Sequence, residues 1–103
     1  PMINTNIKNS HLRIENLFKS IFTEVPNTSI SLNEESVIIE HKDQSNPDAA
    51  SIEIIKLEEV YKISYWDGYS LAEDETEKDL NKALKIFKRF SKKMAKNLIR
   101  FSN

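Results

Sequence analysis

The sequence contains no cysteine and a single glycine, Gly68, and each shortage excludes a class of site. Without cysteine there is no disulfide framework, no thiolate nucleophile and no cysteine-ligated zinc or iron–sulfur cluster. With one glycine, the chain has no glycine-rich loop to hold a phosphate and no glycine-framed nucleophile turn. The two histidines, His11 and His41, are too few for a histidine zinc site, which needs three or four ligands. We therefore expect no catalytic residue, no cofactor and no bound metal.

Long hydrophobic runs are also missing. The longest, residues 37–39, has three apolar residues, whereas a transmembrane helix needs about 20. The first ten residues lack both the basic start and the apolar run of a signal peptide, so we expect a cytoplasmic protein. With 103 residues, of which 39% are hydrophobic, the chain has the size of one domain that buries a core without disulfide or metal staples. We expect a single domain over residues 1–103.

The spacing of apolar residues predicts an N-terminal helix followed by four strands. Residues 7–25 place apolar side chains on one face at the helical period, and Pro26 ends the helix. Residues 43–50 are rich in turn formers and are expected to be a loop. Four short strands are predicted at residues 28–32, 36–42, 51–57 and 60–66. They are expected to pair antiparallel, because their connections are too short for a parallel crossover.

A long amphipathic helix is predicted at the C-terminus, starting between residues 71 and 74. Ser70 with Glu73, or Asp74 with Glu77, fits a capping box at its start. The apolar residues after position 80 form one broad stripe, which is typical of a helix that packs on a sheet. The expected order is α-β-β-β-β-α, with both helices on one face of a four-stranded antiparallel sheet. This is the α+β class.

The net charge of −1 hides a strong asymmetry along the chain. Residues 34–79 carry fourteen acidic side chains and four lysines, a balance of −10. Residues 80–103 carry eight Lys or Arg and no carboxylate, a balance of +8. Such an asymmetry is informative about binding partners rather than about the fold.

The acidic residues are densest in the segment ISYWDGYSLAEDETE, residues 63–77. Carboxylates in the first turn of a helix interact well with the helix dipole, which explains part of this cluster. The helix dipole does not explain the tryptophan and the tyrosine beside the turn. These residue types are typical of interface hot spots. We therefore predict a partner-binding surface without catalytic role, made of Trp66, Asp67, Tyr69, Glu73, Asp74 and Glu77.

The basic face of the C-terminal helix has three interpretations. It could grip phosphate backbones, lie on an anionic membrane, or be the solvated side of a core helix. No aromatic residue sits among the lysines to stack on a base, and the apolar face of the helix is needed for the core. We favour the solvated side, and expect no direct contact with nucleic acid and none with a membrane.

Two other functions stay open at this level. Glu40 and Lys42 have the E-x-K spacing of some Mg²⁺-dependent nucleases, but such sites need an upstream aspartate and none precedes position 43. A small acidic chain could also be a secretion chaperone or a phage-type inhibitor. The apolar seam of the C-terminal helix keeps heptad spacing, so a monomer and a weak dimer are both compatible with the sequence.

Small, cysteine-free, acidic α+β chains of this length resemble the immunity proteins of bacterial contact-dependent growth inhibition and related toxin systems. The resemblance rests on the whole-chain architecture and on the segment YWDGYSLAEDETE. It implies a cytoplasmic protein, without catalytic residues, that binds one cognate toxin domain, often a basic nuclease, and occludes its cationic active site. Carboxylates that imitate phosphate would steer the association and lengthen the residence time of such a complex.

Overall fold

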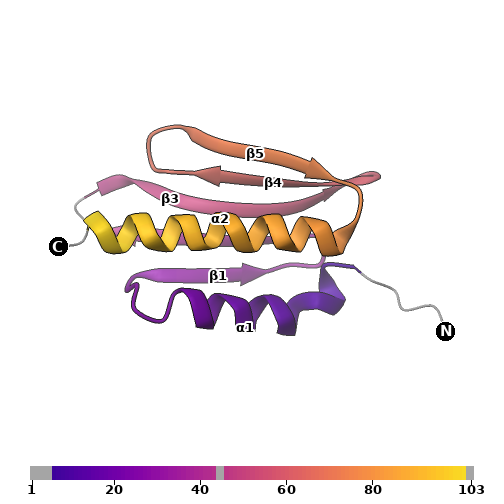
Figure 1. Ribbon diagram of the computed structural model, residues 1–103, viewed down its shortest axis with the longest axis horizontal. Coiled ribbons are helices and arrows are strands. Elements are labelled where there is room, and N and C mark those ends of the chain that lie inside the picture. The colour runs from indigo at the N-terminus through magenta and orange to yellow at the C-terminus, as the bar shows by residue number, and fades with distance from the viewer. Residues whose placement is uncertain (1–5, 44–45, 102–103) are drawn as a thin grey trace.

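The computed structural model describes residues 6–43 and 46–101 and has two layers, a five-stranded sheet and a pair of helices (Figure 1). The predicted α+β class is confirmed, with five strands rather than four. No helix in the described ranges is long and apolar enough to cross a membrane. In chain order the elements are a 3₁₀ turn η1 (Lys8–Ser10), α1 (His11–Ile21), β1 (Thr28–Leu32), β2 (Ser36–Asp43), β3 (Asn46–Leu57), β4 (Val60–Trp66), β5 (Leu71–Glu77) and α2 (Leu80–Phe101).

The sheet is an antiparallel meander in which each strand pairs with its neighbours in sequence, in the order β1-β2-β3-β4-β5. Short connections predict antiparallel pairing, which is confirmed, whereas the strand order is known only from the structure. Strand β3 begins at Asn46, five residues earlier than expected. The reason is that His41 pairs with Ala50 and Asp43 with Asn46, which extends the β2–β3 hairpin into the expected loop. Residues 44–45 of that loop lie outside the described residues.

The fifth strand corrects the prediction that the C-terminal helix starts between residues 71 and 74. Residues Leu71–Glu77 form β5, which pairs with β4 from Trp66 opposite Leu71 to Tyr61 opposite Glu77. Glutamate and aspartate are poor strand formers, so pairing with β4 overrides the local preference of this segment. Charges along an edge strand also discourage it from pairing with a second sheet.

Helix α2 starts at Leu80 because Asp79 caps it. Asp79 Oδ2 accepts a hydrogen bond from the backbone N–H of Lys82 at 3.0 Å, which is the geometry of an N-cap. The capping boxes expected within residues 70–77 are therefore wrong, since that segment is extended.

Helix α1 is shorter than the expected span of residues 7–25. Its regular part is His11–Ile21, and Phe22 is its C-cap. The chain leaves the helix before Pro26, and Asn27 adopts a φ of 63° on the way to β1. Asparagine enters this left-handed region more readily than most residues, so it suits the reversal between the two layers.

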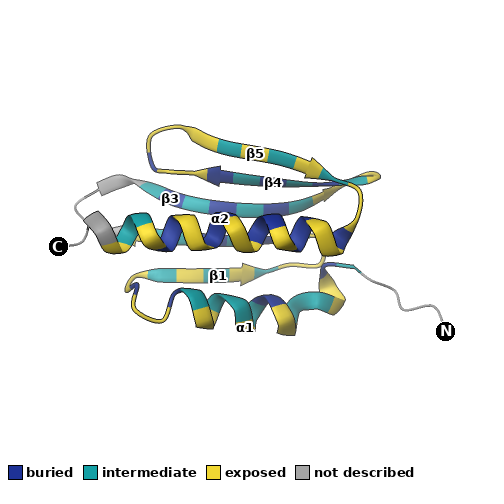
Figure 2. Ribbon diagram, in the orientation of Figure 1, coloured by how far each residue is buried: buried dark blue, intermediate teal, exposed yellow. Residues whose placement is uncertain are grey.

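One face of the sheet is buried beneath the helices and the other face is open. Along β4 the burial alternates residue by residue, and Tyr61, Ile63 and Tyr65 are the buried positions. The fully buried strand residues, each 0% exposed, are Val37, Ile39, Ile52, Ile54 and Ile63. They join one core with the buried stripe of α2 (Figure 2), whose 0% exposed members are Ala83, Phe87, Phe90, Ser91 and Met94. Any partner that binds the sheet must therefore use the open face or an edge.

Candidate functional site

The residues predicted to bind a partner are distributed over different sides of the β4–β5 hairpin. Because residues 71–77 form a strand rather than a helix, successive side chains point to opposite faces of the sheet. The predicted set is therefore not a single surface. It divides into Trp66 and Asp74 on the open face, Asp67 and Tyr69 in the turn, and Glu73 and Glu77 on the face toward α2.

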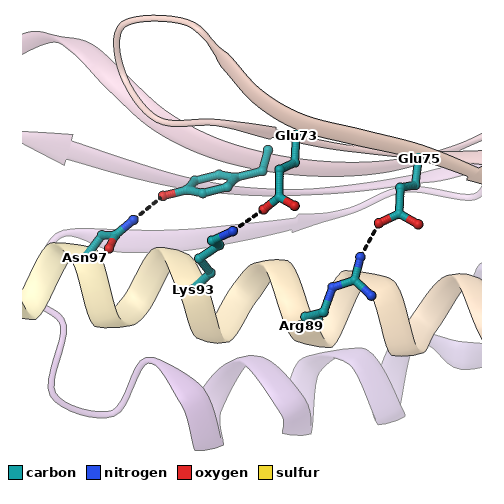
Figure 3. A network of polar contacts seen from close by, with 6 residues as sticks. Glu73, Glu75, Arg89, Lys93 and Asn97 are labelled. Carbon is teal, nitrogen blue, oxygen red and sulfur yellow. Dashed lines mark hydrogen bonds and ion pairs between the residues drawn. The ribbon is translucent and has the colours of Figure 1, made fainter.

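On the side toward α2, two carboxylates of β5 form ion pairs with the helix (Figure 3). Glu73 Oε2 lies 2.5 Å from Lys93 Nζ, and Glu75 pairs with Arg89. These contacts hold the edge strand to α2. They also neutralise two carboxylates of the acidic segment, so these are not free to attract a partner.

Glu77 lies at the far end of β5 from the turn. Its register partner is Tyr61, and at about 3.4 Å per residue it stands about 20 Å along the strand from Leu71. Its Oε1 accepts a hydrogen bond from the backbone N–H of Lys78 at 3.1 Å. Glu77 therefore does not belong to the surface around the turn.

The turn between β4 and β5 is fixed by the side chain of Asp67. Its Oδ1 accepts hydrogen bonds from the backbone N–H groups of Tyr69 at 2.9 Å and Ser70 at 3.0 Å. Gly68 adopts a φ of 102°, which glycine reaches without a steric cost. The two N–H donors, Tyr69 first and Ser70 second, lower the pKa of the Asp67 carboxyl from its ordinary value of 3.8. Asp67 thus stays charged while it holds the backbone that presents Tyr69.

Three large apolar side chains are exposed around this turn: Trp66 at 43%, Tyr69 at 82% and Leu71 at 47%. They are half of the six exposed large apolar side chains in the described part of the chain, gathered within six residues. Trp66 and Leu71 are register partners across the hairpin. We call Trp66, Asp67, Tyr69 and Leu71 the hairpin corner. Exposed aromatic surface gathered in one place is typical of an interaction site.

The open face of the sheet continues from the hairpin corner. Asp74 on this face lies 4.0 Å from Lys62. Glu40 and Glu53 are half-buried and form no ion pair with any described residue. Two rows of register partners define the face: Ser31, Ile38, Glu53, Ser64 and Asp74 in one, and Ser29, Glu40, Ser51 and Trp66 in the next.

The sequence-based set lacks Leu71, Glu40 and Glu53 as members of this surface. With residues 71–77 interpreted as a helix start, nothing marks Leu71 as exposed. A usable signal exists for the glutamates, because period-two alternation in the predicted strands places Glu40 and Glu53 opposite to the isoleucines of the core.

Glu40 and Lys42 lie on β2, where Glu40 has Ser29 and Ser51 as register partners. No second carboxylate therefore stands directly across from Glu40. Within residues 6–43 and 46–101, no group of three His, Cys, Asp or Glu side chains is placed to hold a metal ion. This arrangement gives no support to a Mg²⁺-dependent nuclease, whose metal needs several oxygen ligands.

The outward face of α2 is basic. Five of its lysines are exposed and form no ion pair with the described carboxylates. We call them the lysine stripe: Lys82, Lys85, Lys88, Lys92 and Lys96. The lysine stripe lies on the helix layer, whereas Glu40 and Glu53 lie on the open face of the sheet. The charge asymmetry along the sequence therefore also separates the two layers of the fold.

No protein-family model matches this chain, and no curated protein and no solved structure matches it either. Its binding chemistry is therefore inferred from the surface that the fold presents. That surface has three distinctive features: the hairpin corner, the lysine stripe, and Glu40 and Glu53 of the open face, which form no ion pair with the described residues.

Proposed function

We propose that this protein is an immunity protein: a cytoplasmic binding protein, not an enzyme, that blocks a cognate toxin domain of a bacterial growth-inhibition system. The observation that carries the proposal is the hairpin corner, where Trp66, Tyr69 and Leu71 are exposed beside the carboxylate of Asp67. The proposed target is a nuclease domain, whose active site is cationic because it must bind phosphates.

The aromatic side chains of the hairpin corner supply the anchor of the proposed complex. Tryptophan and tyrosine are enriched among interface residues whose truncation costs about 2 kcal/mol or more. Tyr69 is 82% exposed, so most of this residue is available for burial against a partner. Asp67 holds the turn before any partner arrives, which reduces the conformational entropy lost on binding.

The carboxylates of the surface supply charge complementarity. Asp67 in the turn, and Glu40 and Glu53 on the open face, have no cationic partner within the described chain. They can therefore steer a basic domain toward the surface and pair with its lysines or arginines once water is excluded. The ion pairs of β5 with α2 remove Glu73 from this role. The proposed surface is the hairpin corner with Glu40 and Glu53, together with Asp74, which lies on the same open face beside Lys62.

The experiment is to coexpress this chain with the polypeptide encoded directly upstream and to purify that polypeptide. We expect an equimolar complex, and we expect the nuclease activity of the free polypeptide to disappear in the complex. Replacing Trp66 and Tyr69 by alanine should release the partner and restore its activity.

The matched control replaces two other exposed leucines, Leu12 and Leu57, by alanine. Neither lies in the hairpin corner, so this double variant should retain the complex. Absence of a complex, or equal loss of binding in the two double variants, would contradict the proposal.

A further inference from the structure

The lysine stripe is a continuous feature of α2. Its members are each three or four residues from the next, so they fall on one side of the helix. At a rise of 1.5 Å per residue, the distance from Lys82 to Lys96 along the axis is about 21 Å. Helix α2 lies in front of the middle of the sheet (Figure 1), and all five members of the stripe are exposed to solvent.

Among the described residues, no carboxylate forms an ion pair with a lysine of the stripe. Helix α2 contains no aspartate or glutamate. Helix α1 contains one, Glu15, whose Oε1 lies 3.8 Å from Lys19 Nζ. The carboxylates of β5 reach Arg89 and Lys93, which are not members of the stripe. Five positive charges are therefore concentrated on one side of one helix.

A shallow depression of about 410 Å³ between α1 and α2 adjoins the stripe. Lys92 and Lys96 of the stripe line it together with Ser20 of α1. Three of its six lining residues are apolar, so the depression itself is not a phosphate pocket, and Lys92 and Lys96 supply the cationic groups at this place.

We infer that the lysine stripe binds the phosphate backbone of double-stranded nucleic acid without reading its sequence. A length of 21 Å corresponds to about six base pairs at 3.4 Å per phosphate along one strand. The stripe consists of lysines alone, which carry a point charge on a flexible stem, so we expect its contacts to be mainly with phosphates and to act by releasing counterions. This inference is independent of the proposed toxin binding, which uses the other layer of the fold.

The inference departs from the expectation that the chain makes no direct contact with nucleic acid. That expectation rests on the lack of aromatic side chains among the lysines. Aromatic stacking matters for single strands, whose bases are unpaired. In a duplex the bases are already stacked on each other and the phosphates face outward. The lack of aromatics therefore argues against single strands and does not argue against a duplex.

The test is fluorescence anisotropy with a labelled 20-base-pair DNA duplex of mixed sequence, between 20 and 200 mM NaCl. If all five lysines contact phosphates, log K should fall with log salt at a slope of about −4.5. Affinity should then drop about 500-fold from 50 to 200 mM. The stripe variant Lys85→Gln, Lys88→Gln, Lys92→Gln leaves two contacts and should reduce the slope to about −1.8.

The matched control removes three lysines that each lie near a carboxylate elsewhere, as Lys8→Gln, Lys19→Gln, Lys62→Gln. It has the same net charge as the stripe variant and should keep a slope near that of the wild type, with circular dichroism confirming that both variants are folded. Equal losses in the two variants would overturn the inference, because net charge alone would then explain binding. So would absence of binding at 20 mM NaCl, or tighter binding to polyglutamate or to the separated single strands than to the duplex.

Discussion

Lys93 on α2 and Glu73 on β5 form an ion pair with 2.5 Å between Nζ and Oε2, and this pair joins the most basic element of the chain to its most acidic one. One helical turn further on, Asn97 Nδ2 donates a hydrogen bond to the Tyr65 hydroxyl at 3.1 Å (Figure 3). Some of the acidic residues that suggest a binding partner in the sequence therefore form ion pairs within the fold instead. The partner-binding proposal rests accordingly on the hairpin corner more than on the count of acidic residues.

Breaking this ion pair should have only a small effect on stability. The side chains of Lys93 and Glu73 are 54% and 35% exposed, and pairs of this kind contribute about 0.2–1 kcal/mol. We expect Glu73→Gln to lower the free energy of unfolding in urea by no more than this, and 1 M NaCl to lower it similarly in the wild type. A double-mutant cycle with Lys93→Gln isolates the pair. A coupling energy above about 2 kcal/mol would show that the pair is a structural determinant of β5.

The turn at Asp67 should weaken in acid. Its carboxyl has a lowered pKa because the N–H groups of Tyr69 and Ser70 bind the charged form. A group with a lowered pKa stabilises the fold above its unfolded value, here 3.8, and loses that contribution as the pH falls through the folded value. Carboxyl NMR should therefore show Asp67 titrating below 3.8. The Asp67→Asn variant, which keeps an acceptor oxygen but does not titrate, should lose this part of the acid sensitivity. An Asp67 pKa at or above 3.8 would contradict the turn geometry.

Two isoleucines on adjacent strands test which face of the sheet is buried. Ile63 on β4 is 0% exposed beneath the helices, so Ile63→Ala should cost about 2–5 kcal/mol in the free energy of unfolding. Ile55 on β3 is half-buried and lies on the open face, so Ile55→Ala should cost clearly less, about 1 kcal/mol. Equal costs, measured by urea unfolding, would mean that a second layer covers the open face.

Much of the fold is predictable because hydrophobic periodicity is strong in most of its elements. The alternation in β2, β3 and β4 and the broad apolar stripe of α2 identify these elements and their buried faces. Strand β5 is not predictable in the same way. Its residues after Leu71 are almost all polar, so there is no hydrophobic period, and serine and aspartate before glutamates imitate a helix start. Only the pairing with β4 and the ion pairs with α2 decide the outcome, and both are tertiary.

The residues of the candidate site are predictable where the strand that carries them is predictable, and not where it is not. Trp66 and Tyr69 can be recognised from their position beside a Gly68 turn, whatever follows the turn. The prediction that Glu73 and Asp74 share one surface depends on the predicted helix. It is wrong because neighbouring residues in a strand face opposite sides of the sheet. The alternation that buries Ile39 and Ile52 also indicates that Glu40 and Glu53 share the opposite face of the sheet.

Isothermal titration calorimetry of this chain with the polypeptide encoded directly upstream, which we propose to carry the toxin domain, tests the central proposal most directly. If the hairpin corner anchors the complex, Tyr69→Ala should raise Kd about 30-fold, which corresponds to a loss of about 2 kcal/mol. Leu12→Ala, on an exposed part of α1, should leave Kd within about twofold of the wild type. Wild-type affinity in the Tyr69→Ala variant would contradict the proposal.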